Sequence, residues 1–325
     1  MNNFVSQQIA SGLVSVIIPT YNRADCVTKS IDSVLSQTYN DYEIIVVDDG
    51  STDNTRQILQ SYVDKGLIHY IYQDNAGCAA ARNSGIRAAK GQWIAFLDSD
   101  DTWLPDKLAE QMQYLSETGL DVCFTNTTFD HGEGVETETS NPGQSDRWIV
   151  TDSLDLVTSP NEFHNTLPSM VVRRSLLKKT GSFDEWVIWG SDTRFILKVC
   201  AERPIAYINR NLVIADRTKA RARLTAGREM DSEAGRSYRL MNVLTYAELY
   251  FRCRNQKRHV IKKVKRIFAN YLSSLAVSCC LEGDNYNARR FAKDGLYFGG
   301  GWRTYRRCIA VLLCPWLLRR LRENS

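Results

Sequence analysis

Four short apolar runs alternate with helical patterns in the N-terminal third of the chain, and this order limits the possible folds more than any other feature. The runs are Leu13–Ile18, Glu43–Val47, Leu67–Ile71 and Trp93–Leu97. Nearly continuous apolar runs of this length are typical of strands that are covered on both faces. The segments between them carry apolar residues at helical spacing. Strands that alternate with helices predict an α/β fold, with a doubly wound, mostly parallel sheet flanked by helices.

The remainder of the chain predicts further strands and then a helical end. The additional strands are expected at Asp121–Phe124, Met170–Val172, Pro204–Ile208 and Asn211–Ala215. From about residue 228 the pattern is helical almost to the end. We therefore predict a flexible leader over residues 1–12, an α/β domain over 13–225 and a basic helical C-terminal region over 226–325.

The charge of the chain changes sign along its length. Residues 1–209 hold 16 Lys and Arg against 28 Asp and Glu, a net charge of −12, whereas residues 210–325 hold 25 against 9, a net charge of +16. The basic part is expected to meet an anionic partner, such as a nucleotide diphosphate, an anionic lipid or a nucleic acid. The polar stretch Met1–Ser11 does not resemble a signal peptide, and the scattered cysteines fit a reduced, cytoplasmic setting.

Polar side chains follow three of the predicted strands at the points where the strands end. They are Thr20, Tyr21 and Asn22 after the first strand, Asp48 and Asp49 after the second, and Asp98, Asp100 and Asp101 after the fourth. The carboxyl ends of parallel strands meet at one edge of a sheet, and ligands of such folds bind there. The sequence therefore predicts a polar, acidic binding edge. The alternative is three unrelated turns whose Asp residues cap helices.

The most acidic of these turns carries a candidate metal site. Alternation at a strand end places Asp98 and Asp100 on one side and Ser99 on the other. Two carboxylates on one side suit Mn²⁺ or Mg²⁺, which proteins commonly hold together with substrate phosphates. The alternative is a solvated acidic turn.

Four blocks of the chain together resemble the family 2 glycosyltransferases, inverting sugar transferases with a GT-A fold. The matching stretches are Val16–Arg23, Val47–Asp53, Asn75–Asn83 and Phe96–Asp101, with Gly181–Glu185 and Gly190–Asp192 fitting the acceptor side. The resemblance covers roughly residues 13–215. It implies transfer from a nucleotide-diphosphate sugar, with a UDP-sugar favoured, to a hydroxyl of a glycan or lipid-linked acceptor in cell-surface polysaccharide synthesis. The Gln-x-x-Arg-Trp motif of processive relatives is absent, which favours a non-processive enzyme.

The resemblance also implies roles for residues on the donor side. Asp49 is expected to bind the edge of the pyrimidine ring, and Thr20 and Tyr21 are expected to lie against the base and ribose. Arg82 is expected to approach the diphosphate or to hold the acidic edge together. Asp98 and Asp100 would bind the nucleotide through the divalent metal, with Asp100 as the direct ligand. Two further arginines, Arg217 and Arg221, are candidates for the diphosphate; a solvated basic surface is the alternative.

On the acceptor side, inversion needs a base that takes the proton of the attacking hydroxyl. Asp192 is the candidate, although Ser191 stands where many relatives carry an acidic residue. The alternative role for Asp192 is a helix cap. Trp186 and Trp189 are candidate acceptor-binding residues that could stack on a sugar, with core packing as the alternative.

The C-terminal end predicts contact with a membrane surface. No run of 18 apolar residues exists to span a bilayer, but the apolar stretch Cys308–Leu318 is flanked by arginines on both sides. We therefore expect residues 303–322 to form an interfacial anchor on the cytoplasmic face of the inner membrane. The alternative is a helix that docks on the catalytic domain.

Two other functions compete with sugar transfer. A sugar-phosphate nucleotidyltransferase uses a similar sheet, but it usually carries a Gly-rich phosphate loop where this chain has Pro19–Asn22. A non-catalytic nucleotide-binding module is the second. Nucleic acid is not an expected partner, because carboxylates at the binding edge would repel its phosphates.

Overall fold

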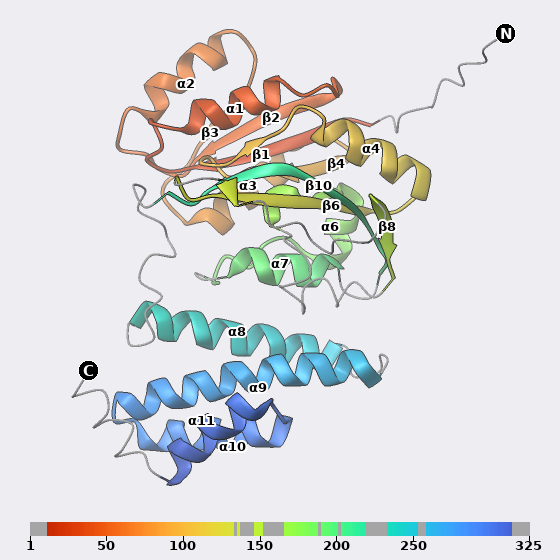
Figure 1. Cartoon of the computed structure of the whole chain (residues 1–325). Helices are drawn as coiled ribbons and strands as arrows, with labels where there is room; N and C mark the ends of the chain where they lie inside the picture. The colour runs from red at the N-terminus through yellow and green to blue at the C-terminus, as the bar shows by residue number, and fades with distance from the viewer. Residues whose placement is uncertain are drawn as a thin grey trace, which may run out of the picture. The chain divides into compact units, whose positions relative to one another are not determined.

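The computed structural model describes residues 12–132, 135–136, 146–151, 166–187, 190–200, 203–218, 233–252 and 258–313. The chain divides into two compact units (Figure 1). The α/β unit comprises Met1–Trp186 and Ser191–Arg221, and the helical unit comprises Val187–Gly190 and Ala222–Ser325.

One mixed sheet forms the centre of the α/β unit. Its described strands are β1 (Val14–Thr20), β2 (Tyr42–Asp48), β3 (His69–Tyr72), β4 (Trp93–Phe96), β5 (Thr102–Trp103), β6 (Val122–Asp130), β7 (Val135–Glu136), β8 (Arg147–Val150), β9 (Val171–Arg173) and β10 (Ile205–Asp216). They lie in the order β3-β2-β1-β4-β9-β6-β10-β5, with β7 beside β6 and β8 beside β10. The neighbours β3, β2, β1 and β4 are parallel, as are β6 and β10. Strand β9 is antiparallel to both β4 and β6.

Helices cover both faces of this sheet (Figure 1). On one face the core contains apolar residues of α1 (Val27–Leu35), α2 (Thr55–Asp64) and α4 (Lys107–Thr118). On the other it contains those of α3 (Cys78–Ala88), α6 (Arg174–Thr180) and α7 (Ser191–Cys200). Within β1, Ile17 faces the second core while Val16 and Ile18 face the first. The prediction of a doubly wound, mostly parallel sheet flanked by helices is therefore confirmed.

The close approach of α3 to the sheet depends on a glycine. A Cβ atom added at Gly85 would lie 2.4 Å from the Cγ2 atom of Ile17, far inside van der Waals contact. Any side chain at this position would push α3 away from β1. The N-terminal end of α3 is thereby held close to the carboxyl ends of the central strands.

Two predicted boundaries were wrong. Pro204–Ile208 and Asn211–Ala215 are not separate strands, because β10 runs through both with an irregular register between Ile208 and Val213. The polar residues Asn209 and Arg210 between the two ranges have partners in the structure, since Asn126 donates to Asn209 at 2.9 Å and Arg210 pairs with Glu110. Pro105 suits a first helical turn, so the sequence predicts a helix that begins at Leu104–Pro105. In the structure α4 begins at Lys107, after β5 has paired with β10.

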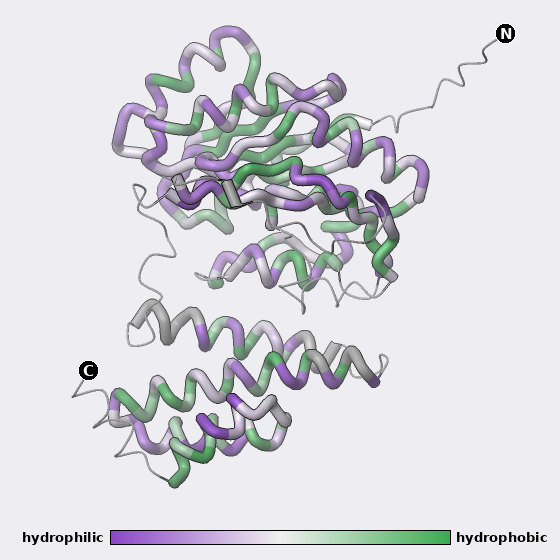
Figure 2. The backbone as a smooth tube through the Cα atoms, in the orientation of Figure 1, coloured by the Kyte–Doolittle hydropathy of each residue, from purple (hydrophilic) through white to green (hydrophobic). Residues whose placement is uncertain are grey.

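The helical unit contains α8 (Glu233–Arg252), α9 (Arg258–Leu281), α10 (Asn285–Phe298) and α11 (Trp302–Leu313). Helix α9 packs against the other three, and apolar and polar residues alternate along it (Figure 2). In α11 the side chains of Thr304, Cys308 and Val311 are buried, whereas Trp302 and Leu313 are exposed. Part of the predicted membrane anchor thus packs within the helical unit, and its residues beyond 313 lie outside the described part of the chain. None of the described helices is long and apolar enough to cross a membrane.

Lys107 is fully buried at the start of α4, where a positive charge is costly. Its Nζ atom donates to Gln111 Oε1 at 2.8 Å and lies 4.0 Å from the centre of the Trp103 ring. Burial lowers the pKa of Lys107 to about 7.

We expect the substitution Lys107→Met to stabilise the protein most at low pH. Between pH 7 and 10 the unfolded wild-type chain binds more protons than the folded one, so wild-type stability rises with pH by up to about 1.4 kcal/mol per unit relative to the variant. Below pH 7 the buried amine is charged, so the whole cost of burying this charge lowers the free energy of unfolding of the wild type. Urea unfolding of both proteins from pH 6 to 10 measures the difference, and a pH-independent difference would contradict the buried titration.

Candidate active site

Three loops meet at the carboxyl edge of the parallel strands. Thr20 lies opposite Asp48 in the register of β1 and β2, and the amide of Asp49 donates to the carbonyl of Thr20 at 2.9 Å. On the other side of β1, the amide of Leu97 donates to the carbonyl of Ile17 at 3.0 Å. The polar turns after β1, β2 and β4 therefore lie side by side, as the strand pattern predicted.

Asn22 ties the first two loops together. It has a positive φ of 51°, a conformation that Asn tolerates better than most residues. Its Oδ1 atom accepts a hydrogen bond from the amide of Thr52 at 2.8 Å, and its own amide donates to Ser51 Oγ at 2.9 Å. The sequence places Asn22 at this edge but does not indicate that it joins the two loops. The only local signal was an Asn directly after a strand, which is common in turns.

Asp49 organises the loop that leads into α3. The buried carboxylate accepts hydrogen bonds from Gln73 Nε2 at 2.7 Å and from the amides of Ala76 and Gly77 at 3.0 and 2.8 Å. Contact between Asp49 and a nucleotide base stays a prediction.

The two candidates after β1 differ in exposure. The Oγ1 atom of Thr20 is buried and has no hydrogen-bond partner among the described residues, whereas the Tyr21 side chain is 44% exposed.

Each carboxylate of the Asp98–Asp100 pair faces an arginine. Arg82 Nη2 donates to Asp98 Oδ1 at 2.7 Å, and Arg23 Nε lies 3.9 Å from Asp100 Oδ2. Asp98 and Asp100 are partly exposed while Ser99 between them is buried, so the alternation predicted from sequence is present. The two arginines supply the positive charge that the acidic turn requires. Arg23 was not singled out from the sequence, because nothing local indicates its partner.

Asp101 has a structural position behind this pair. It is buried, and its Oδ1 atom accepts a hydrogen bond from the amide of Asp216 at 3.1 Å. Burial raises the pKa of Asp101, and the charges of Asp98 and Asp100 raise it further. Arg217 acts in the opposite direction, which places this candidate diphosphate-binding residue near the acidic edge.

The donor set at this edge fits a hard divalent cation. Asp98 and Asp100 are partly exposed and present carboxylate oxygens, the ligand type that such cations prefer. Within the described ranges, however, no three acidic, histidine or cysteine side chains are clustered closely enough to hold a metal by themselves. A metal here would need further ligands from a bound substrate or from water.

Four candidate residues act electrostatically on Cys78 at the start of α3: Asp49, Arg82 and Asp98 from the donor side and Asp192 from the acceptor side. Burial raises the pKa of the Cys78 thiol to about 11, with the charge of Arg82 acting to lower it and those of Asp98, Asp192 and Asp49 acting to raise it. Burial also acts to lower the pKa of Arg82, but Cys78, Asp98 and Asp192 outweigh it and raise that pKa overall. The structure therefore brings Asp192, from a distant part of the chain, within electrostatic reach of the acidic edge.

Helix α7 presents Asp192 in its first turn. The side chain is exposed, and its Oδ1 atom accepts a hydrogen bond from the adjacent amide of Thr193 at 2.8 Å. Phe195 anchors this helix in the core, where its ring stacks on that of Phe183 with 3.9 Å between centroids. Both rings meet the edge of Phe96, which lies two residues before Asp98. One aromatic cluster thus supports the acidic turn and the helix that carries Asp192.

Asn83 joins α3 to the loop before α7. Its Nδ2 atom donates to the carbonyl of Phe183 at 2.9 Å and to Glu185 Oε1 at 2.8 Å, while the amide of Phe183 donates to its Oδ1 atom at 2.9 Å. Asp184 in the same loop pairs with Arg194 of α7 at 2.6 Å. The sequence around Asn83 does not indicate this role, because its partners lie about 100 residues away.

The remaining acceptor-side candidates are only partly described. Trp186 is 57% exposed, and the guanidinium of Arg194 lies 5.2 Å from the centre of its ring. Core packing, the alternative for this tryptophan, does not apply. Trp189 and Arg221 lie outside the described residues.

Comparison with known proteins identifies the fold and the family. The profile of the family described as Glycosyl transferase family 2 matches residues 15–181, just over half of the 325-residue chain. The chain belongs to glycosyltransferase family 2. The matched range contains the acidic edge, Arg82 and Asn83, and it ends before α7.

Two curated relatives each match about a third of the chain. A putative teichuronic acid biosynthesis glycosyltransferase, TuaG of Bacillus subtilis, is 47% identical over 116 residues, which is 35% of this chain and 46% of the relative. The β-1,3-glucosyltransferase WfaP of Escherichia coli, named for UDP-Glc and α-D-GlcNAc-diphosphoundecaprenol, is 40% identical over 114 residues, 35% of this chain and 45% of the relative. The chain thus spans less than half the length of each.

A solved structure resembles much more of the chain. S. aureus TarS 1–349, in complex with UDP-GlcNAc, has a TM-score of 0.69 and 20% identity, and the match covers 94% of this chain and 89% of that one. At this identity the likeness supports the GT-A fold alone.

For this family 2 domain we expect Asn83→Ala to lower the free energy of unfolding by about 1–3 kcal/mol, because the buried backbone groups of Phe183 would lose their partners. Urea unfolding at pH 7 measures the change. In Asn83→Asp the acceptor for the Phe183 amide remains, but the donor is lost and a second carboxylate faces Glu185. Wild-type stability in both variants would contradict the role of this contact.

Proposed function

We propose that the α/β unit is an inverting, non-processive glycosyltransferase. It moves a sugar from a nucleotide-diphosphate sugar, with a UDP-sugar favoured, to a hydroxyl of a glycan or lipid-linked acceptor in cell-surface polysaccharide synthesis. The observation that carries this proposal is that Asn83 and the Phe96 cluster join α3 and the acidic turn to the loop and helix of Asp192, and that Asp192 acts electrostatically on Arg82 and Cys78. The exposed carboxylate of Asp192 is within electrostatic reach of the Arg82–Asp98 pair, and this supports a site for a diphosphate next to a general base. The names of TuaG, WfaP and TarS support the nucleotide-sugar donor and the polysaccharide context.

The donor would bind along the carboxyl edge of β1, β2 and β4. Asp49 would accept a hydrogen bond from the base. The Oγ1 atom of Thr20, which has no partner among the described residues, would bond to the base or ribose, and Tyr21 would lie against them. Arg82 and Arg217 would stabilise the negative charge of the departing diphosphate. A divalent metal, Mn²⁺ or Mg²⁺, held by Asp100 with Asp98, would add positive charge at the same phosphates.

The acceptor would lie between this edge and the first turn of α7. Asp192 would take the proton of the acceptor hydroxyl as its oxygen attacks the anomeric carbon from the face opposite the leaving group. A single displacement of this kind inverts the configuration at that carbon. Trp186 is exposed and could stack on the acceptor sugar, in line with the general use of aromatic rings in sugar binding.

A donor screen tests this function directly. Purified protein is incubated with a panel of nucleotide sugars and Mn²⁺ or Mg²⁺, and release of nucleoside diphosphate is recorded. We expect slow, metal-dependent release from one donor. Release of pyrophosphate from a sugar phosphate and a nucleoside triphosphate would instead identify a nucleotidyltransferase. If calorimetry detects no binding of any nucleotide sugar, the transferase proposal is wrong.

The domain boundaries at residues 12 and 225 and the location on the cytoplasmic face of a membrane remain proposals. The exposed residues Trp302, Arg303, Tyr305 and Arg306 of α11 support contact with a lipid surface, since aromatic and basic side chains suit the headgroup region. Arg307 is less available for contact with lipid headgroups, because its guanidinium donates to Ser274 Oγ at 2.8 Å.

A further inference from the structure

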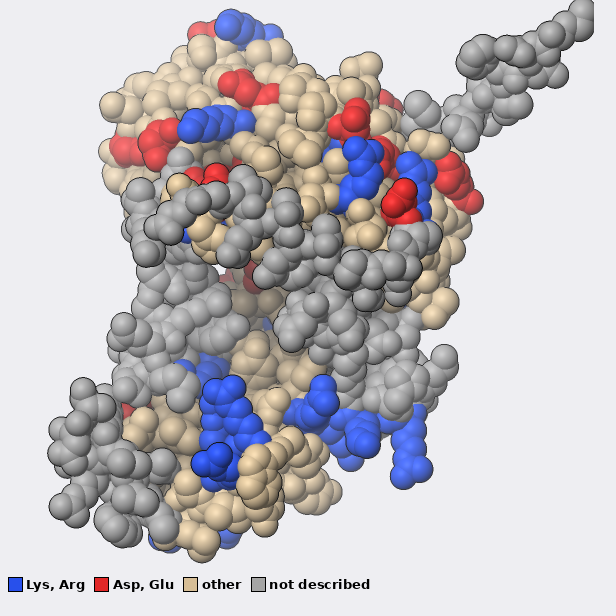
Figure 3. All heavy atoms as spheres, in the orientation of Figure 1, with Lys and Arg blue, Asp and Glu red and all other residues tan. Residues whose placement is uncertain are grey.

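The strongest concentration of positive charge in the chain lies on α9. No Asp or Glu occurs between Glu248 and Glu282, and this stretch carries eight Lys and Arg. All eight precede Ile267, so the charge is confined to the end of α8, the connection and the first turns of α9. In Figure 3, Lys and Arg predominate over Asp and Glu on the described surface of the helical unit.

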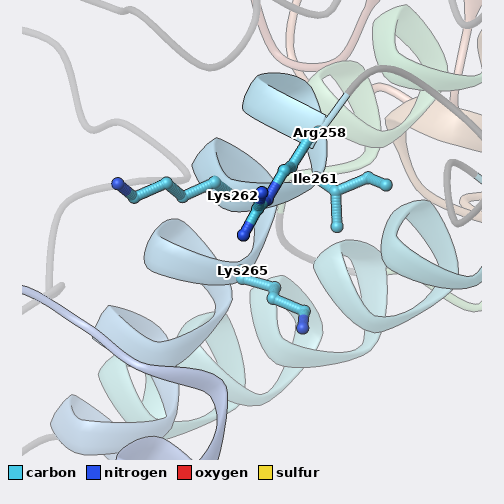
Figure 4. A pocket seen from close by; sticks show the side chains of 4 residues that line it. All are labelled: Arg258, Ile261, Lys262 and Lys265. Atoms are coloured by element: carbon cyan, nitrogen blue, oxygen red, sulfur yellow. The ribbon is translucent and has the colours of Figure 1, made fainter.

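Three of these cations line an open pocket. Arg258, Lys262 and Lys265 extend from successive turns of α9 around a hollow of about 690 Å³, and Ile261 contributes an apolar wall (Figure 4). Their spacing of four and three residues places them on one face of the helix. Because Arg258 is the first residue of α9, the positive end of the helix dipole adds to their charge.

The charge of this pocket is not neutralised within the described part of the chain. No described carboxylate forms an ion pair with Arg258, Lys262 or Lys265. The described neighbour of Lys265 is the ring of Tyr250, whose centre lies 5.3 Å from Nζ. Three cations beside an aliphatic wall and an aromatic ring suit a ligand that is both phosphorylated and partly apolar.

We propose that this α9 pocket binds the phosphate groups of an anionic phospholipid surface. Charge complementarity argues for phosphates, and the apolar wall with the exposed aromatic residues Trp302 and Tyr305 in the same unit argues for a lipid source. The proposal assigns a lipid contact to α9, in addition to the one that the sequence predicts for residues 303–322. It does not depend on the proposed transfer reaction.

Vesicle sedimentation with the full-length protein tests the pocket. The probes are vesicles of phosphatidylcholine alone and vesicles that also contain phosphatidylglycerol. The test variant is Lys262→Gln/Lys265→Gln. The matched control is Arg289→Gln/Arg290→Gln, which removes the same charge from exposed positions of α10. Thermal unfolding checks that both variants fold.

We expect wild type and the α10 control to bind the anionic vesicles. The α9 variant should bind them about 30-fold more weakly, in keeping with about 1 kcal/mol for each of the two lysines at such a surface. Equal weakening in the two variants would overturn the proposal, since it would indicate general charge attraction. Equal binding to phosphatidylcholine alone would also overturn it.

Two further binding measurements distinguish a lipid headgroup from other ligands that carry phosphate. Calorimetric binding of free pyrophosphate that is lost in the α9 variant, without any vesicle binding, would assign the pocket to a soluble ligand and overturn the lipid assignment. Tighter binding to a short duplex DNA than to anionic vesicles would overturn it in favour of a nucleic acid. No binding to the DNA, together with vesicle binding, is the expected result.

Discussion

The substitution Asp192→Asn is expected to lower the turnover number by about 10²–10⁴-fold, the range typical for loss of a general base. Asparagine cannot take a proton from the acceptor hydroxyl, but it can still accept the hydrogen bond from the Thr193 amide. Because Asn also serves well near a helix N-terminus, thermal stability should be unchanged. The variant thus separates the two roles considered for Asp192, since a cap would survive the change and a base would not.

Three measurements decide the outcome for Asp192. They are the turnover number from nucleoside diphosphate release, donor affinity by calorimetry and the midpoint of thermal unfolding. Asp64→Asn, the same change on an exposed carboxylate of α2, is the control. Unchanged turnover in Asp192→Asn would show that another group accepts the proton.

The second large effect is expected for Asp100→Asn. Loss of this carboxylate should lower turnover by about 10²–10³-fold, comparable with removal of one group that stabilises transition-state charge. The metal concentration needed for donor binding should rise as well. Asp100 is preferred to Asp98 for this test, because Asp98 is bonded to the buried Arg82 and its removal would leave that guanidinium unpaired.

A metal titration of donor binding distinguishes a metal ligand from a residue with only a structural role. The matched control is Asp106→Asn, which neutralises an exposed carboxylate just outside the acidic turn. We expect the control to keep the wild-type metal requirement. If Asp100→Asn also keeps it while turnover falls, Asp100 does not bind the metal and acts through Arg23 instead.

Local patterns were sufficient to predict the elements around the site. The apolar run that became β1 is buried along its whole length, as continuous apolar runs predict. The turns after β1, β2 and β4 then had to share one edge, because parallel neighbours end on the same side. Residue pairs far apart in sequence were not predictable in this way. The contacts of Asn83 with Phe183, and of Arg23 with Asp100, depend on how the chain returns to the sheet.

The course of the sheet beyond β4 shows the same limit. Each of β9 and β10 was expected from its apolar residues, but not the antiparallel insertion of β9 between β4 and β6, nor the continuity of β10. Strand order and bulges depend on hydrogen bonds between strands that are far apart in the sequence, and a local residue pattern does not specify these bonds. In α11 the apolar residues Cys308 and Val311 suggested a lipid contact, yet they are buried within the helical unit.

The sequence by itself determined the four parallel strands β1 to β4, where the acidic turns fall and to which family the chain belongs. These properties follow from residue periodicity and from short motifs, both of which are local. Only the tertiary structure decided that Asp192 lies near Arg82 and Asp98, and that an arginine faces each carboxylate of the acidic turn. Such contacts join residues far apart in the chain, and packing of the whole core sets them.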